Sequence, residues 1–538
     1  MKITNNLSLI LPSVSALAMM PMATGCGKAK AKEAKTPEKP NIVFIMTDDH
    51  TAQMMSAYDT RHISTPNLDR IANDGVKFTR SYVANSISGP SRACMLTGKH
   101  SHKNGFTDNE NSVFNGDQPT FPKYLQKQGY QTAIFGKWHL ESLPQGFDKW
   151  SVLPGQGDYW NPDFIEMNGD TVQHHGYLTN IITDRSLDWL ENERDPEKPF
   201  CLMIHHKAIH RDWLPDTCDL ELYEDRTFEY PANFNDDYKG RPAAEAAEMR
   251  IGRDMDLIYD LKMDRPDKNS RLKDRYHSYI DRMDSAQRAR FDAFYGPIIE
   301  DFYAQNLQGD TLTRWKYQRY MRDYAKVVKS LDDNVGRVLK YLEDHDMLKN
   351  TLVVYTSDQG FYMGEHGWFD KRFMYEESLN TPLVMMLPEG YKARGEISEM
   401  VQNIDYAPTF LDLAGIEKPA DMQGVSLLPL LKGEHPADWR KSIYYHFYEY
   451  PAEHAVKRHY GVRNDRYKLI HFYNDIDRWE LYDLQADPME MHDIYGQPGT
   501  EEITAEMMQE LKRLQEEYDD PIRFKYLIDN NQPTNTKK

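Results

Sequence analysis

Four clusters of polar residues follow short apolar runs that lie far apart in the chain. The apolar runs predict buried strands at residues 41–46, 130–135, 200–204 and 351–356. The clusters that follow them are Asp48-Asp49, Gly136-Lys137-Trp138-His139, His205 to His210, and Asp358-Gln359. Because ligands of open α/β sheets bind at the carboxyl ends of the strands, the four clusters can share one site.

The residue types in these clusters suit the hydrolysis of an anionic ester. One set supplies only oxygen ligands, which favours Ca²⁺ or Mg²⁺ over zinc, although paired Asp residues also occur in solvated loops. That set is Asp48, Asp49, Asp358 and Gln359. A second set can neutralise a tetrahedral oxyanion: Arg92, Lys137, His139 and Lys371. His210 is a candidate general acid for the leaving oxygen.

The candidate nucleophile is Ser88, which opens the stretch Ser-Gly-Pro-Ser-Arg-Ala-Cys-Met-Leu-Thr-Gly. A hydroxyl at a turn before a helix faces unpaired backbone N–H groups and the positive end of the helix dipole. That place suits a nucleophile or a bound anion. The alternative is that Ser88 and Ser91 only cap a helix running to Gly98. Cys94 has apolar neighbours, which predicts a buried, inert thiol.

Strand patterns alternate with helix patterns, which predicts an α/β fold with a mostly parallel sheet covered by helices on both faces. Helices are predicted at residues 66–73, 120–127, 180–193, 311–345 and 406–413, and further strands at 76–82 and 381–387. Residues 214–310 lack buried-strand runs, which indicates a helical insertion over one rim of the core. The predicted catalytic domain spans residues 41–440.

The chain changes character near residue 441. Short aromatic-rich strands are predicted at residues 443–448, 460–463, 467–472 and 479–483, followed by an amphipathic helix at 501–518. This pattern predicts a smaller C-terminal α+β domain at residues 441–530, with an antiparallel sheet and a helix packed on it.

The N-terminus predicts export. Residues 1–25 have a charged start and an apolar stretch interrupted by Ser and Pro, which is too short to span a membrane. The sequence Ala-Thr-Gly-Cys that ends at Cys26 resembles a bacterial lipoprotein signal, in which Cys26 becomes the lipidated first residue. Residues 26–40 form a polar tether. We expect a periplasmic, lipid-anchored protein; the alternative is an ordinary or uncleaved secretory signal.

Charge and cysteine content limit the possible partners. The 538 residues carry a net charge of −19, so the surface as a whole repels nucleic acid and anionic membranes. An anionic substrate therefore needs a local basic site, and contact with a membrane is expected only through the lipid anchor. With Cys26 lipidated, the other three of the four cysteines allow at most one disulfide.

Five blocks of the chain, in order, resemble the type I sulfatases. Two blocks, Ser88-Gly89-Pro90-Ser91-Arg92 and Leu96-Thr97-Gly98, are together similar to their signature Cys/Ser-x-Pro-Ser-Arg…Leu-Thr-Gly. The other matching blocks are Asp48-Asp49, Gly136-Lys137-Trp138-His139 and Asp358-Gln359. The resemblance runs from about residue 40 to about residue 520. It implies an alkaline-phosphatase-like fold.

The resemblance also implies a mechanism that an unmodified serine cannot run. In that family the signature Cys or Ser is oxidised to formylglycine, whose hydrate attacks sulfur, and its second hydroxyl then expels sulfate. By motif position Ser88 is the modified residue and Arg92 steadies it. The implied Ca²⁺ ligands are residue 88 with Asp48, Asp49, Asp358 and Gln359. Lys137 and Lys371 would bind sulfate, His139 would assist its elimination, and His210 would protonate the leaving sugar oxygen.

Two departures from the family pattern matter. Gln359 stands where the family usually has Asn; its side chain still offers a carbonyl oxygen, so metal binding is expected to survive, but the resemblance does not fix the metal geometry. The signature begins with Ser, which implies a serine-type, anaerobic radical maturing enzyme as a partner.

The implied substrate is a sulfated oligosaccharide. Residues 205–211 and 370–376 look most like the glucosamine-6-sulfatase branch, which implies removal of the 6-O-sulfate of N-acetylglucosamine from the end of a heparan- or heparin-type chain. Asp370 and Arg372 are expected to contact sugar hydroxyls. His454, Arg458 and His459 lie on a loop that could close over the sugar or could simply be a solvated basic loop.

Three alternatives stay open. The chain could be a sulfatase for another sulfated sugar. It could be a phosphatase or phosphodiesterase of the same superfold that uses Ser88 directly, although two-zinc phosphatases need differently placed His ligands. It could also be a non-catalytic lipoprotein that binds sulfated glycans and leaves Ser88 unmodified.

Overall fold

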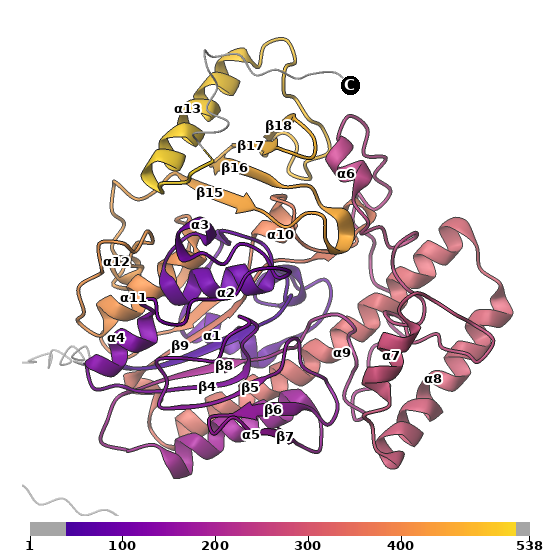
Figure 1. The fold of residues 1–538 in the computed structure, drawn as a ribbon, viewed down its shortest axis with the longest axis horizontal. Coiled ribbons are helices and arrows are strands. Elements are labelled where there is room, and N and C mark those ends of the chain that lie inside the picture. Colours follow the sequence, from indigo (N-terminus) through magenta and orange to yellow (C-terminus); the bar gives the residue numbers. More distant parts are fainter. Residues whose placement is uncertain (1–38, 523–538) are drawn as a thin grey trace, which may run out of the picture. The chain divides into compact units, whose positions relative to one another are not determined.

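The computed structural model describes residues 39–522 and is built around a ten-stranded mixed sheet (Figure 1). The strand order is β13-β2-β12-β9-β1-β8-β4-β5-β6-β7. Five neighbouring strands at its centre are parallel: β9 (Thr351–Ser357), β1 (Asn41–Thr47), β8 (Phe200–His205), β4 (Gln131–Lys137) and β5 (Lys149–Leu153). The predicted mostly parallel sheet is confirmed.

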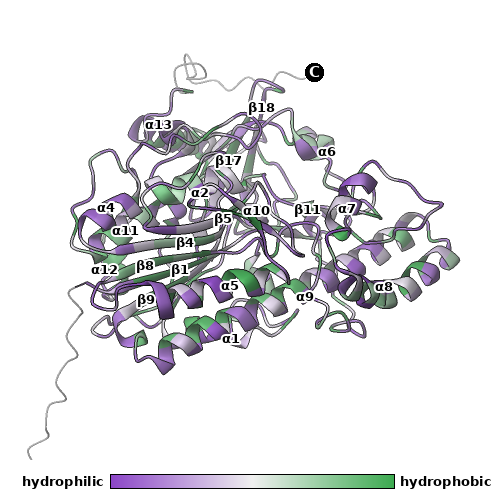
Figure 2. Ribbon diagram, turned by 60° about the horizontal axis from the view of Figure 1, so that its bottom comes forward, coloured by the Kyte–Doolittle hydropathy of each residue, from purple (hydrophilic) through white to green (hydrophobic). Residues whose placement is uncertain are grey.

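Both faces of the central strands are buried, which explains why residues 42–46 of β1 are continuously apolar rather than alternating. Val43 and Ile45 face a core shared with α1 (Pro66–Asp74), α5 (Leu178–Asp188) and α9 (Gly309–Asp344). Ile42, Phe44 and Met46 face the opposite core, which is shared with α2 (Ser88–Thr97), α4 (Phe121–Lys127) and α11 (Tyr406–Leu413). Figure 2 shows the apolar strands between these two helical layers.

Several edge elements differ from prediction. The predicted strand at residues 76–82 is two strands, β2 (Val76–Phe78) and β3 (Ser81–Tyr82), and the strand predicted at 381–387 is β12 (Leu383–Met386), which is antiparallel to β9. The strands that were not predicted are β5, β6 (Asp163–Glu166), β7 (Thr171–Gln173), β10 (Tyr362–Met363), β11 (Phe369–Asp370), β13 (Gly395–Ile397) and β14 (Val401–Gln402). All of β7 is exposed, so it carries no apolar pattern.

The insertion between β8 and α9 contains helices and loops, as predicted. Its helices are α6 (Pro242–Ala246), α7 (Lys273–Ile280) and α8 (Ser285–Gln305), and Figure 1 shows α7 and α8 beside α9. A capping box at Asp284 and Gln287 starts α8. Phe291, Tyr295 and Phe302 of α8 are buried in the same core as α9, so the insertion is packed firmly.

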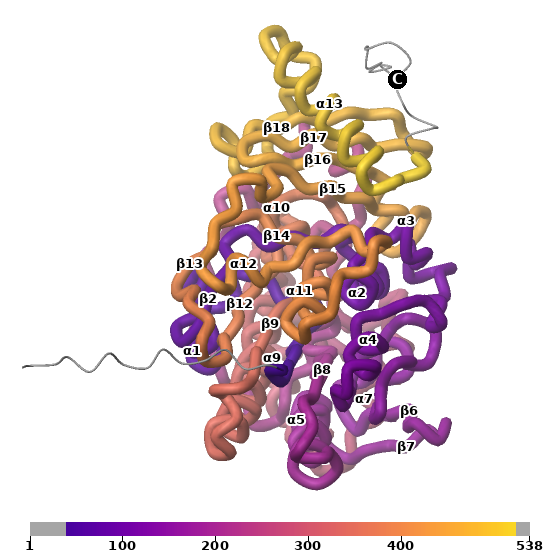
Figure 3. The backbone as a smooth tube through the Cα atoms, turned by 90° about the vertical axis from the view of Figure 1, so that its left-hand side faces the viewer, coloured from indigo at the N-terminus to yellow at the C-terminus, as the bar shows by residue number. Residues whose placement is uncertain are grey.

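The C-terminal region is the predicted antiparallel sheet with a helix on one face. Its strands are β15 (Ser442–Phe447), β16 (His459–Asn464), β17 (Tyr467–Phe472) and β18 (Arg478–Asp483), and the helix is α13 (Glu501–Glu517). The other face packs on Trp368, Phe373 and Tyr375 from the loops after β9. Figure 3 shows these strands above α10 (Glu376–Leu379).

Shorter elements complete the described chain: α3 (Ser101–Asn104), β10 (Tyr362–Met363), β11 (Phe369–Asp370) and α12 (Leu428–Leu431). Within residues 39–522, no helix has the length and apolar character needed to cross a membrane. The predicted signal sequence, Cys26 and nearly all of the tether lie outside the described residues.

Candidate active site

Four oxygen-bearing side chains meet at the carboxyl edge of the parallel strands. Asp48 and Asp49 follow β1, and Asp358 and Gln359 follow the adjacent strand β9. The Asp49 N–H donates to Asp358 Oδ1 (3.3 Å), and Gln359 Nε2 donates to Asp49 Oδ1 (2.5 Å). All four residues are fully buried. Among the described residues Gln359 Oε1 has no hydrogen-bond partner, which leaves a free amide oxygen in this cluster.

Ser88 joins the same cluster. Its Oγ donates to Asp48 Oδ1 over 2.9 Å, and the residue is 1% exposed. Helix α2 begins at Ser88 itself, with Ile87 as the N-cap residue and no side-chain cap hydrogen bond. The alternative in which Ser88 merely caps the helix is therefore wrong. Cys94 lies fully buried in the same helix, and burial raises the pKa of its thiol to about 12, as expected of an inert cysteine.

The glycine after Ser88 allows close packing at this helix start. A Cβ on Gly89 would lie 2.5 Å from Phe106 Cε1 and 2.5 Å from Asn109 Oδ1. The Gly89 N–H also donates to Asn109 Oδ1 (3.1 Å). A side chain at position 89 would therefore force Phe106 and Asn109 to move.

Each carboxylate in the cluster contacts a cation. Lys137, the last residue of β4, places Nζ on Asp48 Oδ2. Lys371 Nζ lies 2.6 Å from Asp49 Oδ1. Arg92 donates through Nε (3.0 Å) and Nη2 (2.8 Å) to Asp358 Oδ2. Such pairing makes buried charges tolerable.

Burial disfavours the charged form of the Asp49 carboxylate, at the centre of the site. It raises the pKa of Asp49 to about 6, and the neighbouring Lys371 opposes this shift. A divalent cation would hold the carboxylate in its charged form. One carboxylate oxygen from each of Asp48 and Asp49 lies within 4.8 Å of the other and of a ring nitrogen of His210.

Two histidines border the cluster. His210 Nδ1 lies 2.6 Å from the carbonyl oxygen of Arg211, which fixes Nδ1 as a donor and leaves Nε2, 4.0 Å from Asp49 Oδ2, facing the site. His139 Nε2 lies 3.3 Å from Gln156 Nε2, and its buried Nδ1 has no partner among the described residues. Burial and the nearby lysines hold the pKa of both imidazoles well below the usual range.

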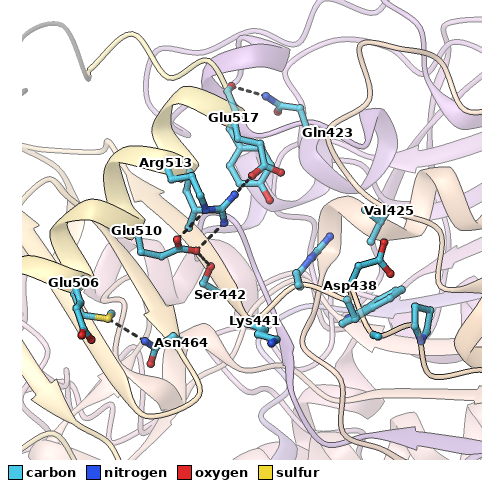
Figure 4. Close-up of a pocket in the computed structure, with 17 residues that line it drawn as sticks. Gln423, Val425, Asp438, Lys441, Ser442, Asn464, Glu506, Glu510, Arg513 and Glu517 are labelled. Atoms are coloured by element: carbon cyan, nitrogen blue, oxygen red, sulfur yellow. Dashed lines mark hydrogen bonds and ion pairs between the residues drawn. The ribbon is translucent and has the colours of Figure 1, made fainter. Parts of the chain in front are cut away.

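A cavity of 260 Å³ opens onto Ser88. Its walls include His139, His210, Lys371, Asp370 and Arg372, all of which the sequence predicted as site residues. A larger groove of 860 Å³ lies between α13 and residues 436–442 and is lined by side chains such as Glu510 and Arg513 (Figure 4). It shares no residue with the carboxylate cluster, so we place the chemistry in the smaller cavity.

The five predicted sugar contacts divide into two groups. Asp370 and Arg372 form an ion pair in the cavity wall. His454 is 6% exposed, and its Nε2 lies 3.2 Å from Asp370 Oδ2, so it supports that wall from behind. Arg458 does not line this cavity. Its guanidinium donates instead to Asp475 (3.0 Å) and to a backbone carbonyl.

His459 cannot contact a sugar. It is fully buried, and its Nε2 accepts the N–H of Met374 over 3.0 Å. It starts β16, with Phe447 and Phe472 as its partners on the two neighbouring strands. The prediction that His459 contacts the substrate is therefore wrong.

Gln156 and Tyr324 contact the predicted site residues but were not predicted, and neither were cavity-lining residues such as Asn109, Tyr259 and Arg275. Gln156 accepts from Lys137 Nζ (2.5 Å) and stands beside His139. Gln156 follows strand β5, which was not predicted. Had β5 been predicted, the polar residues after its carboxyl end would have included Gln156. Tyr324 on α9 donates to the Asp49 carbonyl (2.6 Å), but its place in an apolar helical stripe gave no signal.

Comparisons with known proteins agree with this geometry. A family model described as Sulfatase matches residues 40–416, and one described as N-sulphoglucosamine sulphohydrolase, C-terminal, matches residues 364–517. The N-acetylglucosamine-6-O-sulfatase of Bacteroides thetaiotaomicron is 52% identical over 96% of this chain and 92% of its own. The N-acetylglucosamine-6-sulfatase of Homo sapiens is 28% identical over 80% of this chain and 71% of its own.

Solved structures agree as well. One solved structure shows a protein bound to its substrate, D-glucosamine-2-N,6-O-disulfate. It matches this chain with a TM-score of 0.85 and 52% identity, over 90% of this chain and 99% of the other. A phosphonate monoester hydrolase from Silicibacter pomeroyi has a TM-score of 0.65 at 20% identity, covers 90% of this chain and 97% of the other, and shows the shared fold alone. These matches agree with the cluster of oxygen ligands and with the two lysines that contact its carboxylates. The chain belongs to the sulfatase family of enzymes.

Proposed function

We propose that this protein is an exo-acting sulfatase that removes the 6-O-sulfate of N-acetylglucosamine in heparan- or heparin-type chains. The observation that carries the proposal is the 52% identity, over nearly the whole chain, to a sulfatase named for that sugar. The small volume of the reaction cavity, 260 Å³, suits a single terminal sugar and so supports an exo mode.

The oxygen cluster fits Ca²⁺. Two Asp residues, a third carboxylate and a free amide oxygen offer hard oxygen ligands, and a cation would relieve the desolvated charge on Asp49. The residues that would hold it are Asp48, Asp49, Asp358, Gln359 and residue 88. When present, the ion and a formylglycine made from Ser88 would supply an oriented nucleophile for the sulfur atom.

The protein's own cations would then bind the sulfate. We expect Lys137 and Lys371 to turn from Asp48 and Asp49 to the sulfate oxygens, and Arg92 to remain on Asp358. His139 stands where it can assist elimination of sulfate.

His210 would protonate the leaving sugar oxygen through Nε2, its cavity-facing nitrogen. Its pKa is low because burial and nearby lysines disfavour a positive charge. A bound sulfate ester would oppose that effect and favour the protonated form that a general acid needs.

We also propose export to the periplasm with lipidation at Cys26, and maturation by a serine-type sulfatase-maturing enzyme. The sequence supports both proposals: the Ala-Thr-Gly-Cys motif that ends at Cys26, and the Ser-Gly-Pro-Ser-Arg signature that begins at Ser88.

Sulfate release from a panel of monosaccharides tests the specificity. We expect kcat/KM for N-acetylglucosamine 6-sulfate to exceed the values for its 3-sulfate and for N-acetylgalactosamine 6-sulfate by at least about tenfold, which is the effect of a single lost hydrogen bond to a charged group. Faster release from either other sugar would contradict the proposed specificity, and turnover of a phosphate ester alone would favour a phosphatase.

A further inference from the structure

A second cavity lies directly beside the one that holds Ser88. Its volume is 600 Å³, and it shares Arg211, Arg275 and Glu453 with the reaction cavity. Arg271, from the loop before α7, also lines it. The two cavities therefore form adjoining parts of one binding region, with the helical insertion as a common wall.

Arg271 and Arg275 lack carboxylate partners among the described residues. Arg211, the third arginine in the wall, is paired with Asp260 (2.6 Å) and Glu453 (2.6 Å). A nearby residue of α7 that does form an ion pair is Lys273, whose Nζ lies 2.9 Å from Asp264 Oδ1. The two arginines are thus the cations of this wall that remain available to a ligand.

Arg275 is held in place by aromatic rings rather than by a counter-charge. Its guanidinium carbon lies 5.1 Å from the centre of the Tyr259 ring, and its Nε donates to Tyr279 Oη over 3.3 Å. Its terminal nitrogens have no hydrogen-bond partner in the described chain. A planar guanidinium that is positioned by stacking and free at its fork suits a carboxylate or sulfate.

The nearby carboxylates are mostly paired already. Asp254 is occupied by Arg253 (2.6 Å) and by the N–H of Arg250 (2.8 Å). Glu453 is taken by Arg211, which leaves Glu248 as the unpaired carboxylate among the described wall residues. Three arginines and three carboxylates line the second cavity, so its wall has no net charge, but two of the arginines are unpaired and offer guanidinium donors to an anionic ligand.

We propose that the second cavity binds the sugar that follows the 6-sulfated glucosamine along the substrate, and that Arg271 and Arg275 bind its carboxylate. The proposal rests on the proposed function and names the substrate more closely: a chain in which an acidic sugar stands next to the terminal glucosamine. Tyr259, which lines the reaction cavity, would contact the junction between the two sugars.

Three substrates test this proposal on the matured protein. They are N-acetylglucosamine 6-sulfate, its disaccharide with a uronic acid on the reducing side, and the same disaccharide with the carboxyl group reduced to an alcohol. We expect kcat/KM for the acidic disaccharide to exceed the other two values by roughly ten- to hundredfold, through KM, with an advantage that shrinks as salt rises.

Charge-removing variants locate the effect. The double variant R271Q/R275Q should lose most of the preference for the acidic disaccharide. The matched control R290Q removes a charge from α8 of the same insertion, where Arg290 pairs with Glu221 outside both cavities, and should keep the preference. If the double variant has a lowered Tm, the single variant R271Q, at an exposed position, decides the question by a partial loss.

An equal kcat/KM for the acidic and the reduced disaccharide would overturn the proposal, and so would an unchanged preference in R271Q/R275Q. An N-sulfated monosaccharide gives a third test. If its turnover alone depends on the two arginines, the cavity binds the N-sulfate of the same sugar ring and the proposal is wrong. Failure of the wild-type protein to release sulfate from N-acetylglucosamine 6-sulfate would instead contradict the proposed function.

Discussion

The Ser88 hydroxyl donates a hydrogen bond to Asp48 Oδ1 over 2.9 Å, and so joins the first residue of α2 to the end of β1. These residues are 40 positions apart in the chain. The contact places the side chain of residue 88 among buried oxygen ligands, beside Gln359 Nε2 at 3.4 Å. The proposed metal binding and the proposed modification of Ser88 therefore involve the same group of buried side chains.

Calcium should stabilise the folded protein. Because the ligands meet only in the folded state, Ca²⁺ at 100 times its Kd should raise the free energy of unfolding by about 2.7 kcal/mol. Thermal unfolding with Ca²⁺ and with EGTA measures the effect. The variant Gln359→Leu removes the free amide oxygen and should reduce it, whereas Gln145→Leu, at an exposed position, should not. An unchanged Tm with Ca²⁺ would contradict the assignment of the ligands.

His210→Ala should lower the turnover of sugar sulfates by about 10²- to 10⁴-fold, the usual contribution of a general acid. An aryl sulfate should suffer less, because its leaving group needs no proton. The control His175→Ala changes an exposed histidine and should leave both rates intact. Equal losses on the aryl and sugar substrates would remove His210 from the acid role.

Gly136→Ala should disrupt the site from within β4. Gly136 has a φ of +103°, and a Cβ there would lie 2.0 Å from the carbonyl oxygen of His205. The control Gly129→Ala also has a positive φ (+86°), but its Cβ would meet nothing within 4 Å. Gly129→Ala should cost about 1–2 kcal/mol from backbone strain alone. Gly136→Ala should be clearly less stable in denaturant unfolding, and equal losses would remove the clash from the explanation.

The sequence predicted the chemistry of the site better than its edges. Asp48, Lys137 and Asp358 were predictable because central parallel strands are continuously apolar and end at one sheet edge. Gln156 was missed because β5 has only five residues, two of them Lys149 and Ser151, and so has a weaker apolar signal. Each site prediction was therefore only as good as the prediction of the strand before it.

The error at His459 has a similar cause. The strand was predicted to begin at Tyr460, whereas β16 begins at His459. That shift of a single residue moved a buried histidine into a predicted loop beside Arg458, where it looked like part of a basic surface. Its true setting depends on strand neighbours that are distant in the sequence, Phe447 and Phe472.

Glu480 should make stability depend on pH. It is fully buried and accepts from Tyr482 Oη (2.7 Å) and Tyr375 Oη (3.0 Å), and burial raises its pKa to about 7 from 4.5. The folded protein therefore holds a proton that the unfolded chain releases between these pH values. Its contribution to stability is greatest below pH 4.5 and falls by roughly 3 kcal/mol as the pH rises through 7.

The variant Glu480→Gln stays neutral, so its Tm relative to that of the wild type should increase between pH 5 and pH 8. Thermal unfolding at the two pH values measures this difference. A constant difference would show that Glu480 is charged in the folded protein at both.

The most direct test joins the mass of the peptide that spans Ser88 to sulfate release from N-acetylglucosamine 6-sulfate. The protein would be produced with and without a serine-type maturing enzyme, with Ser88→Ala as the inactive reference. We predict that maturation removes two hydrogens from Ser88 and that sulfate release rises in proportion to the modified fraction. Full activity with unmodified Ser88, or a modified protein that leaves this sugar sulfate intact, would contradict the account.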